Sequence, residues 1–419
     1  MSELWLKVVR SGGTQAYTLL AGAAVLVVTA RWLGPEGRGE IAAVTTWVGL
    51  FCTLGYLSLG QVAIYRATVL RGRSWLGTTL GSLAVLGALI TLLGWSVFGS
   101  LFAVSHGTLF GGLPFLPLAV GFLALPLVIW EQYSAALLMA VDHVEIYNCG
   151  QVIGRTVGVL LVIIACYLEW SVVGVLVAML ISQGIVALFG VRFLFRRAGS
   201  MMPDSSTIRD LVKGATRLHP NYVGGFLMTS SSILIVNHYL GAVETGQYQT
   251  ALQIVGLLLV LPQGASMVMY GQVTRLGPVG AWVHQRNVIA VLMFVALCMA
   301  ATAAVLAPWG VRAVLGERFV PVIGLLQILL LGVVGMTLAT AMSSQWIGRG
   351  MLGRLSLLTI GLGVLSVTAN LVLVPRFGTF GAAWASVGSY ALAAAAQGWL
   401  MLKCESEVGD VREPIPERS

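Results

Sequence analysis

Two charged side chains lie within apolar stretches of the sequence, and they are its first candidates for chemistry. Glu131 lies in the apolar run 115–137, and Arg155 lies in the next run, 148–167. In consecutive antiparallel helices the two charges would lie at a similar depth, and a salt bridge would make their burial tolerable. Alternatively, Arg155 faces an internal cleft and binds phosphate oxygens through two parallel hydrogen bonds, while Glu131 tunes its charge.

Uncharged polar residues in other apolar runs form a second group of candidates. Asn237 and His238 end the run 219–239, and a histidine changes its charge near neutral pH. The alternative for both is ordinary hydrogen bonding at the membrane interface. Side-chain amides elsewhere would either contact sugar hydroxyls in a cleft or bond neighbouring helices to one another. These amides are Gln253, Gln263, Gln327 and Asn370.

The composition indicates that helices crossing a membrane must position these side chains. The chain has 419 residues, is 58% hydrophobic and 10% charged, and has a mean hydropathy of +0.90. So few charges cannot cover the surface of a soluble protein of this size. Apolar runs of about 18 or more residues recur along the chain, which is the signal of transmembrane helices. We therefore predict an all-α polytopic membrane protein with twelve transmembrane helices. Their predicted ranges are 11–33, 41–65, 76–98, 115–137, 148–167, 170–191, 219–239, 248–272, 287–307, 321–346, 355–374 and 380–402.

The distribution of lysine and arginine predicts the orientation. With both termini in the cytoplasm, most of the 24 basic residues fall on the cytoplasmic side, as the positive-inside rule requires. This asymmetry accounts for the net charge of +8 without a nucleic-acid partner. The basic residues expected in outer turns are Arg31, Arg38, Arg312, Arg318 and Arg376.

The two halves of the chain match each other at a fixed offset of 207 residues. Gly34 then corresponds to Gly241, and Gly39 corresponds to Gly246. Because six helices per half is an even number, both halves enter the membrane in the same direction, and the repeat is parallel. The predicted domains are an N-terminal six-helix lobe at 1–198, a cytoplasmic linker at 199–218, a C-terminal six-helix lobe at 219–403 and a cytoplasmic tail at 404–419.

Sequence features of enzymes, cofactor sites and metal sites are missing. There is no Walker motif, no nucleophile elbow and no zinc-ligand spacing, and the five cysteines are scattered. We expect no catalytic residues, no cofactor and no metal. The one pair of acids worth testing for a membrane-embedded glycosyltransferase or ligase is Asp142 and Glu145, and a solvated turn is the alternative explanation of this pair.

Three segments resemble a known family. "ARWLGPEGRGEIAAVTTWVGLFCTLGYLSLG" (30–60), "YLGAVETGQYQTALQIVGLLLVLPQGAS" (239–266) and "LVLVPRFGTFGAAWASVGSYALAAAAQGWLM" (371–401) resemble segments of the multidrug/oligosaccharidyl-lipid/polysaccharide (MOP) flippase superfamily, and most of all its Wzx-type polysaccharide branch. The resemblance implies two six-helix lobes around a central cleft that opens to each side in turn.

The resemblance also implies a function and a set of partners. Members of this branch move lipid-linked (polyprenyl diphosphate) oligosaccharide from the inner to the outer leaflet for surface polysaccharide biosynthesis. The expected location is the inner (cytoplasmic) membrane of a bacterium, with membrane lipids and the polysaccharide polymerase and glycosyltransferase machinery as further partners. A cation-coupled exporter of small molecules or drugs is the alternative within the superfamily. However, the runs of the second half contain no acidic residue for a cation site.

The repeat suggests one further site for such a substrate. Arg10 and Arg217 are related by the 207-residue offset and lie at the inner starts of the first and seventh predicted helices. Across the repeat axis they would form a fork for a diphosphate arriving from the cytoplasmic leaflet, and Arg66 would join them. Ordinary anchoring of the helix ends by arginine is the alternative.

Overall fold

The computed structural model describes residues 2–69, 74–199 and 201–412, and it describes their side chains from Gly12 onward apart from those of residues 65, 68, 69, 74, 217, 218 and 408–412. Every regular element in these ranges is a helix, as the composition predicted. The first half contains α1 (Ser2–Gly55), α2 (Leu59–Val69), α3 (Ser74–Ser105), the 3-10 helix η1 (Thr108–Phe110), α4 (Phe115–Leu123), α5 (Leu125–Ala140), α6 (Val144–Tyr167) and α7 (Ser171–Ala198). The second half contains α8 (Ser205–Thr229), α9 (Ser231–Leu240), α10 (Ala242–Leu258), α11 (Val260–Val314), the 3-10 helix η2 (Glu317–Phe319), α12 (Val322–Leu330), α13 (Val333–Gly348) and α14 (Leu352–Arg412).

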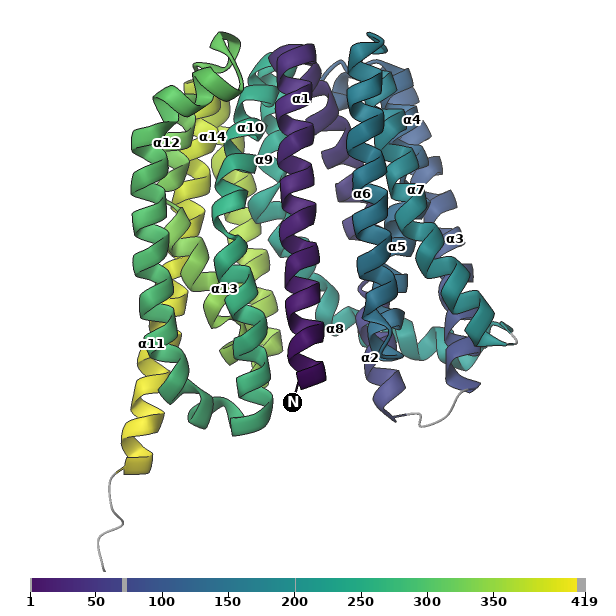
Figure 1. Ribbon diagram of the computed structural model, residues 1–419, viewed down its shortest axis with the longest axis vertical. Helices are drawn as coiled ribbons and strands as arrows, with labels where there is room; N and C mark the ends of the chain where they lie inside the picture. The colour runs from purple at the N-terminus through teal and green to yellow at the C-terminus, as the bar shows by residue number, and fades with distance from the viewer. Residues whose placement is uncertain (1, 70–73, 200, 413–419) are drawn as a thin grey trace, which may run out of the picture.

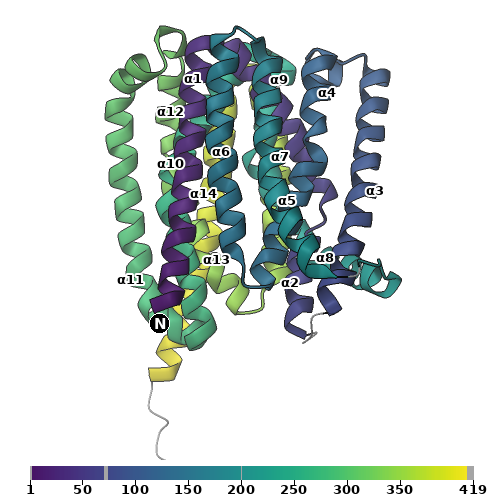
Figure 2. The same ribbon diagram turned by 45° about the vertical axis from the view of Figure 1, so that its right-hand side comes forward.

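The helices run side by side along the length of a single bundle (Figures 1 and 2). Among the described residues, eight helices are long and apolar enough to cross a membrane, or nine if the bent pair α12 and α13 is one span. Both α1 and the last helix, α14, have their chain-terminal ends at the same end of the bundle (Figure 1). We call this the terminal end and the opposite one the far end.

Three of the longest helices each consist of two helices joined at a non-helical glycine. These glycines are Gly34 in α1, Gly277 in α11 and Gly378 in α14, and their φ angles are 67°, 72° and 62°. A positive φ costs glycine little and strains other residues, so the sequence allows the break at these points. The turn predicted after the first helix is therefore shorter than expected, since the helix resumes at Pro35.

The breaks recur at equivalent places in the two halves. Gly34 and Gly241 both have a positive φ with an extended ψ of −170° and −172°. Ala124 separates α4 from α5, and Leu331, its equivalent at the 207-residue offset, follows α12 at the bend before α13. Such agreement along the chain supports the internal repeat proposed from the sequence.

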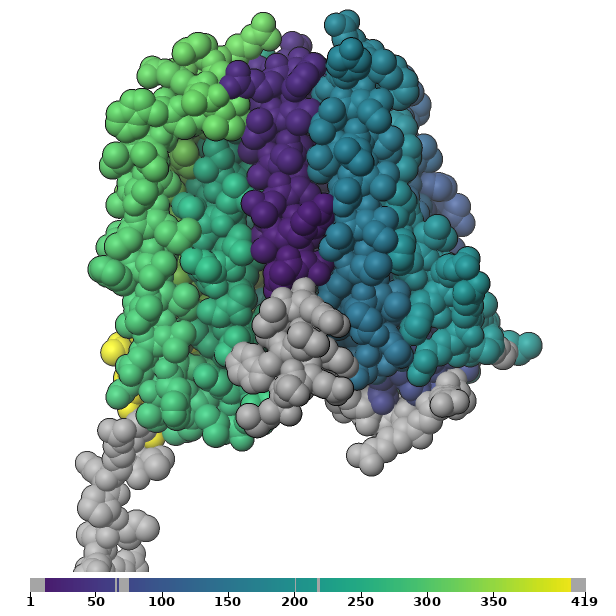
Figure 3. Space-filling model, in the orientation of Figure 1, coloured from purple at the N-terminus to yellow at the C-terminus, as the bar shows by residue number. Residues whose placement is uncertain are grey.

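Buried apolar residues form separate cores in the two halves, and α1 contributes to both. The core of the first half includes Tyr133 and Phe122, and the larger core of the second half includes Tyr248 and Phe319. Leu26 of α1 belongs to the second core. The first helix, predicted as part of the N-terminal lobe, thus packs between the halves, as Figures 1 and 3 show.

The segment predicted as a linker is largely helical. Only residues 199–204 separate α7 from α8, which begins at Ser205. The carboxylate of Asp204 accepts a hydrogen bond from the backbone N–H of Thr207 at 2.9 Å and so caps the helix. Hydrogen bonds from Ser206 and Thr207 lower the pKa of this carboxyl group to about 2.

Candidate functional site

Two adjoining cavities lie inside the bundle. The first, which we call the central cavity, has a volume of about 420 Å³ and lies between both arms of α1, α4, α5, α6, α7 and α10. The second, the mouth cavity, has a volume of about 880 Å³ and lies nearer the terminal end, between the start of α1, α5, α6 and α11. Thr18 and Arg155 line both cavities, so the two are continuous at these side chains.

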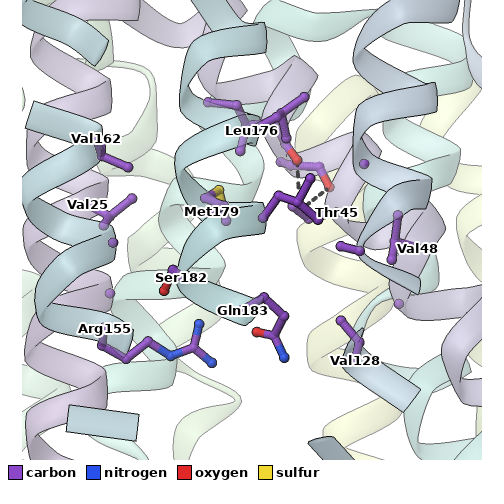
Figure 4. Close-up of a pocket in the computed structure, with 18 of the residues that line it drawn as sticks. Val25, Thr45, Val48, Val128, Arg155, Val162, Leu176, Met179, Ser182 and Gln183 are labelled. Carbon is purple, nitrogen blue, oxygen red and sulfur yellow. Dashed lines mark hydrogen bonds between the residues drawn. The ribbon is translucent and has the colours of Figure 1, made fainter. Parts of the chain in front are cut away.

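Arg155 points into open space from α6, and Gln183 of α7 points into the same space (Figure 4). The Nε atom of Arg155 donates a hydrogen bond to Oε1 of Gln151 at 3.2 Å. Its two terminal nitrogens have no protein partner among the described residues. The guanidinium thus faces an internal cavity, as in the hypothesis that Arg155 binds an anion in a cleft.

Glu131 is connected to Arg155 indirectly. Its buried carboxylate accepts hydrogen bonds from the amides of Gln151 and Gln183 and from the hydroxyl of Tyr147, the last at 3.2 Å. Because Gln151 also accepts from Arg155, it relays the contact between the two charges. The direct salt bridge considered in the sequence analysis is absent between these two described side chains, and neutral donors hold the carboxylate instead.

Arg38 is a cavity residue that the sequence analysis missed. It was expected in a solvated outer turn, yet its side chain is only 4% exposed and lines the central cavity. Its Nη2 donates hydrogen bonds to the amide oxygens of Gln249 and Gln253, the latter at 2.8 Å. The Gly-Pro sequence at 34–35 was the available signal, since proline favours the first position of a helix and so places Arg38 in the first turn.

Among the predicted amide and histidine sites, only Gln253 lines one of the two cavities. Asn237 is buried, and its Nδ2 donates to the carbonyl oxygen of Phe110 at 3.1 Å, while His238 is exposed and packs edge-on against Tyr239. Asn370 is buried and bonds Ser366 of its own helix at 2.8 Å. None of these three side chains lines either cavity.

The remaining polar candidates are scattered. Gln263 accepts a hydrogen bond from Gln15 at 3.4 Å, and Gln327 donates one to the carbonyl oxygen of Ala304 at 3.5 Å. Oε1 of Glu145 lies 2.7 Å from Nδ1 of His143. Asp142, the other acid of the pair considered for an enzyme, lines the mouth cavity.

Of the three arginines predicted to form a fork at the inner mouth, only Arg66 has a described side chain. Arg66 donates to the carboxylate of Asp210 at 2.7 Å and to the hydroxyl of Thr207 at 3.2 Å. This ion pair holds the side chain of Arg66 against α8 and compensates its positive charge. The side chains of Arg10 and Arg217 lie outside the described residues.

The charged residues that line the two cavities are Arg38, Arg155, Arg275, Glu131 and Asp142. Arg38 and Arg155 are the charged residues that line the central cavity, whereas Glu131 and Asp142 accompany Arg155 and Arg275 in the mouth cavity. Among the described residues, no group of three His, Cys, Asp or Glu side chains is placed to hold a metal ion. A guanidinium suits the oxygen atoms of an anion, and the central cavity offers two such groups beside apolar walls.

The sequence of the chain matches one known protein family. The family described as "Polysaccharide biosynthesis protein" matches residues 5–271. The comparison with curated protein sequences found no match. The match covers more than half of the chain, and it includes every residue that lines the central cavity and all that line the mouth cavity except Gln272 and Arg275.

Solved structures share the fold. The inward-facing conformation of a multidrug resistance MATE family transporter of the MOP superfamily has a TM-score of 0.75 at 17% identity, over 96% of this chain and 96% of that chain. The outward-facing conformation of a MATE family transporter scores 0.68 at 18% identity, over 97% of this chain and 96% of that chain. The lipid II flippase MurJ, in an inward closed conformation, scores 0.78 at 11% identity, over 94% of this chain and 88% of that chain.

Proposed function

Because the chain belongs to the polysaccharide biosynthesis protein family, we propose that it is a flippase for lipid-linked oligosaccharide. Its substrate is a polyprenyl diphosphate that carries sugars, which it moves from the inner to the outer leaflet of a bacterial cytoplasmic membrane by alternating access. The family and the transporter fold support transport rather than an enzymatic reaction. Glycosyltransferases would supply this substrate, and a polymerase would consume it.

One observation carries the proposal: a continuous cavity begins near the terminal end and reaches the middle of the bundle, with the guanidinium of Arg155 where its two parts join. Arg155 lines both cavities, and its two terminal nitrogens have no hydrogen-bond partner among the described residues. A phosphate-linked sugar cannot cross hydrocarbon unaided, since each hydroxyl group that loses its hydrogen bonds costs about 2–7 kcal/mol. A hydrated, cationic route would remove that cost, and the guanidinium fork suits phosphate oxygens.

The proposal includes twelve membrane crossings in two six-helix lobes. A 54-residue helix such as α1 would be about 80 Å long if unbroken, more than twice the hydrocarbon core of about 30 Å. Each of the three long helices is therefore taken as two crossings that meet at Gly34, Gly277 or Gly378. The repeated breaks and the two cores support lobes at 1–198 and 219–403, with α1 shared at their interface.

The direction of opening follows from the position of the larger cavity. The mouth cavity lies toward the terminal end, which the charge distribution assigns to the cytoplasm. We therefore take the described conformation to be open toward the cytoplasm, with the mouth cavity as its entrance. In this form, the substrate would enter from the cytoplasmic leaflet.

A second function, the export of a small molecule coupled to a cation, is favoured by one feature. Glu131 is a buried carboxylate that lines the mouth cavity, and a carboxylate of this kind can carry a proton or sodium ion. Its bonds to three neutral donors satisfy it without a cation, so we rank this function second. A Glu131→Gln variant that still transports lipid-linked oligosaccharide would exclude coupling through this group.

The test uses cells in which this chain is the sole flippase for its polysaccharide. Arg155→Ala should stop surface polysaccharide formation and cause lipid-linked oligosaccharide to accumulate on the cytoplasmic leaflet. Arg155→Lys should retain only part of the activity, because lysine cannot form the two parallel bonds. The matched control is Arg196→Lys, at the exposed end of α7, which should behave as wild type. Normal polysaccharide export by Arg155→Ala would contradict the proposed function.

A further inference from the structure

Arg38 connects the two halves of the chain and also faces the central cavity. It lies on the second arm of α1, and both amides that accept its hydrogen bonds, Gln249 and Gln253, lie on α10 of the other half. Gln253 in turn donates to the carbonyl oxygen of Gly22, on the first arm of α1, at 3.2 Å. The three side chains thus hold α10 against both arms of α1.

The guanidinium of Arg38 is incompletely satisfied. Its bonds go to neutral oxygens, those of the two amides and the hydroxyl of Thr29 at 3.3 Å. Its Nε atom is buried, and it has no hydrogen-bond partner among the described residues. A buried charge that is paired only with neutral oxygens is costly, so an anion that accepted a hydrogen bond from Nε would stabilise this guanidinium.

We propose that Arg38, Gln249 and Gln253 form a latch that closes the far end of the cavity, and that the phosphate group of the substrate releases it by binding Arg38. The inference rests on the proposed function, because it takes the substrate to be an anionic lipid. It adds a second phosphate site beyond Arg155 and a role for that site in opening the protein.

The physical reason is an exchange of partners. Opening the far end requires α10 to move away from the second arm of α1, which breaks the bonds from Arg38 to both amides. Without a ligand this leaves a guanidinium bare, whereas a phosphate would replace the amide oxygens and also engage Nε through parallel charge-assisted bonds. A ligand that pairs with Arg38 only after release shifts the equilibrium toward the released form.

The experiment measures opening at the far end directly. Spin labels at Glu169, in the exposed turn after α6, and at Glu317, in η2, report the distance between the halves. The exposed Cys149 and Cys298 are replaced by serine to avoid labelling them. Double electron–electron resonance in nanodiscs is recorded without lipid, with polyprenyl diphosphate, and with the neutral polyprenol of the same chain length.

Polyprenyl diphosphate should increase the population with a long distance between labels, and the neutral polyprenol should leave it unchanged. Arg38→Gln removes both the latch cation and the phosphate site, so its distances should not change when polyprenyl diphosphate is added, and its binding of this lipid should weaken about ten- to a hundredfold. Arg38→Lys, which keeps the charge, serves as the folding control and should respond partially. The double variant Gln249→Leu, Gln253→Leu removes the latch but keeps the cation, and it should show the long distance without lipid.

Two results would overturn the latch: a full response to polyprenyl diphosphate in Arg38→Gln, or a double glutamine variant that stays as closed as wild type without lipid. Failure of wild-type protein to bind polyprenyl diphosphate at all would instead overturn the proposed function and, with it, release by phosphate. In that case the double glutamine variant still decides whether the contact closes the far end. The two failures are therefore distinguishable.

Discussion

Gly39 and Gly246, equivalent residues of the two halves, pack directly against each other where α1 crosses α10. A Cβ atom on Gly39 would lie 1.7 Å from the carbonyl oxygen of Ala242, and one on Gly246 would lie 1.9 Å from the carbonyl oxygen of Pro35. The contact is reciprocal, since Pro35 and Ala242 are themselves equivalent in the repeat. Equivalent residues therefore meet in a reciprocal contact, as a two-fold relation between the halves would produce.

Replacing either glycine by alanine should force the two helices apart. We expect Gly39→Ala and Gly246→Ala each to lower stability by about 1–3 kcal/mol, because backbone atoms cannot move aside as a flexible side chain would. Thermal melting of the purified protein in detergent measures the loss. Gly256→Ala in the same helix α10 is the control, since its Cβ would meet nothing within 4 Å. Equal melting temperatures for all variants would contradict this close approach.

The charge distribution makes a prediction about topology. Both termini and the segment 199–204 should be cytoplasmic, because most of the basic residues then lie on the cytoplasmic side. Reporter fusions that are active only inside or only outside the cell, inserted within this segment, provide the measurement. An outside location would reverse the orientation of the mouth cavity and require a different direction of transport.

Arg10 and Arg217 remain a predicted phosphate fork at the cytoplasmic mouth. An anchor in the lipid headgroups needs only charge, whereas a two-bond phosphate site needs the guanidinium shape. Arg10→Lys and Arg217→Lys should each impair export with normal expression, and Arg196→Lys should not. Full polysaccharide export by the double Arg10→Lys, Arg217→Lys variant would leave only the anchoring role.

The membrane potential should drive the proposed flipping. A lipid diphosphate carries about two negative charges, and outward movement across an inside-negative membrane gains roughly 2.3 kcal/mol per charge for each 100 mV. In proteoliposomes, collapsing the potential at constant pH should therefore slow transport severalfold. Transport that survives this treatment but stops when a pH gradient is removed would point to proton coupling.

The cap at Asp204 should make the start of α8 sensitive to acid. Its pKa of about 2 lies below the ordinary value of an aspartic acid, about 4, because Ser206 and Thr207 donate hydrogen bonds to the ionised form. The stabilisation is thus complete above pH 4 and is lost as the pH falls toward 2. Hydrogen exchange at residues 205–209, corrected for its intrinsic pH dependence, should rise over that window.

Substitution separates the cap from other effects of acid. Asp204→Ala should show fast exchange at every pH, and Asp204→Asn should stay protected, because asparagine is also a good helix cap. If Asp204→Ala exchanged as slowly as wild type at neutral pH, the cap would not stabilise the start of α8.

The sequence by itself determined the helical architecture and its repeat. In hydrocarbon every backbone N–H and C=O group must bond within its own segment, so apolar runs of sufficient length are helices regardless of their neighbours. Glycines such as Gly34 and Gly241 interrupt those helices at equivalent points, and this too is a local property. Arg155 was recognisable for the same reason, since a charge within an apolar run is costly wherever the run packs.

Only the tertiary structure decided which polar side chains meet. Glu131 is held by residues of α6 and α7 rather than by a direct bond to Arg155, and Arg66 is committed to Asp210 of α8. These contacts depend on how each helix is rotated about its axis, because the rotation decides which side chains face the neighbouring helix. A helix that is apolar on all sides carries no sequence signal for that rotation. The burial of Arg38 depends likewise on α10, which lies more than two hundred residues away along the chain.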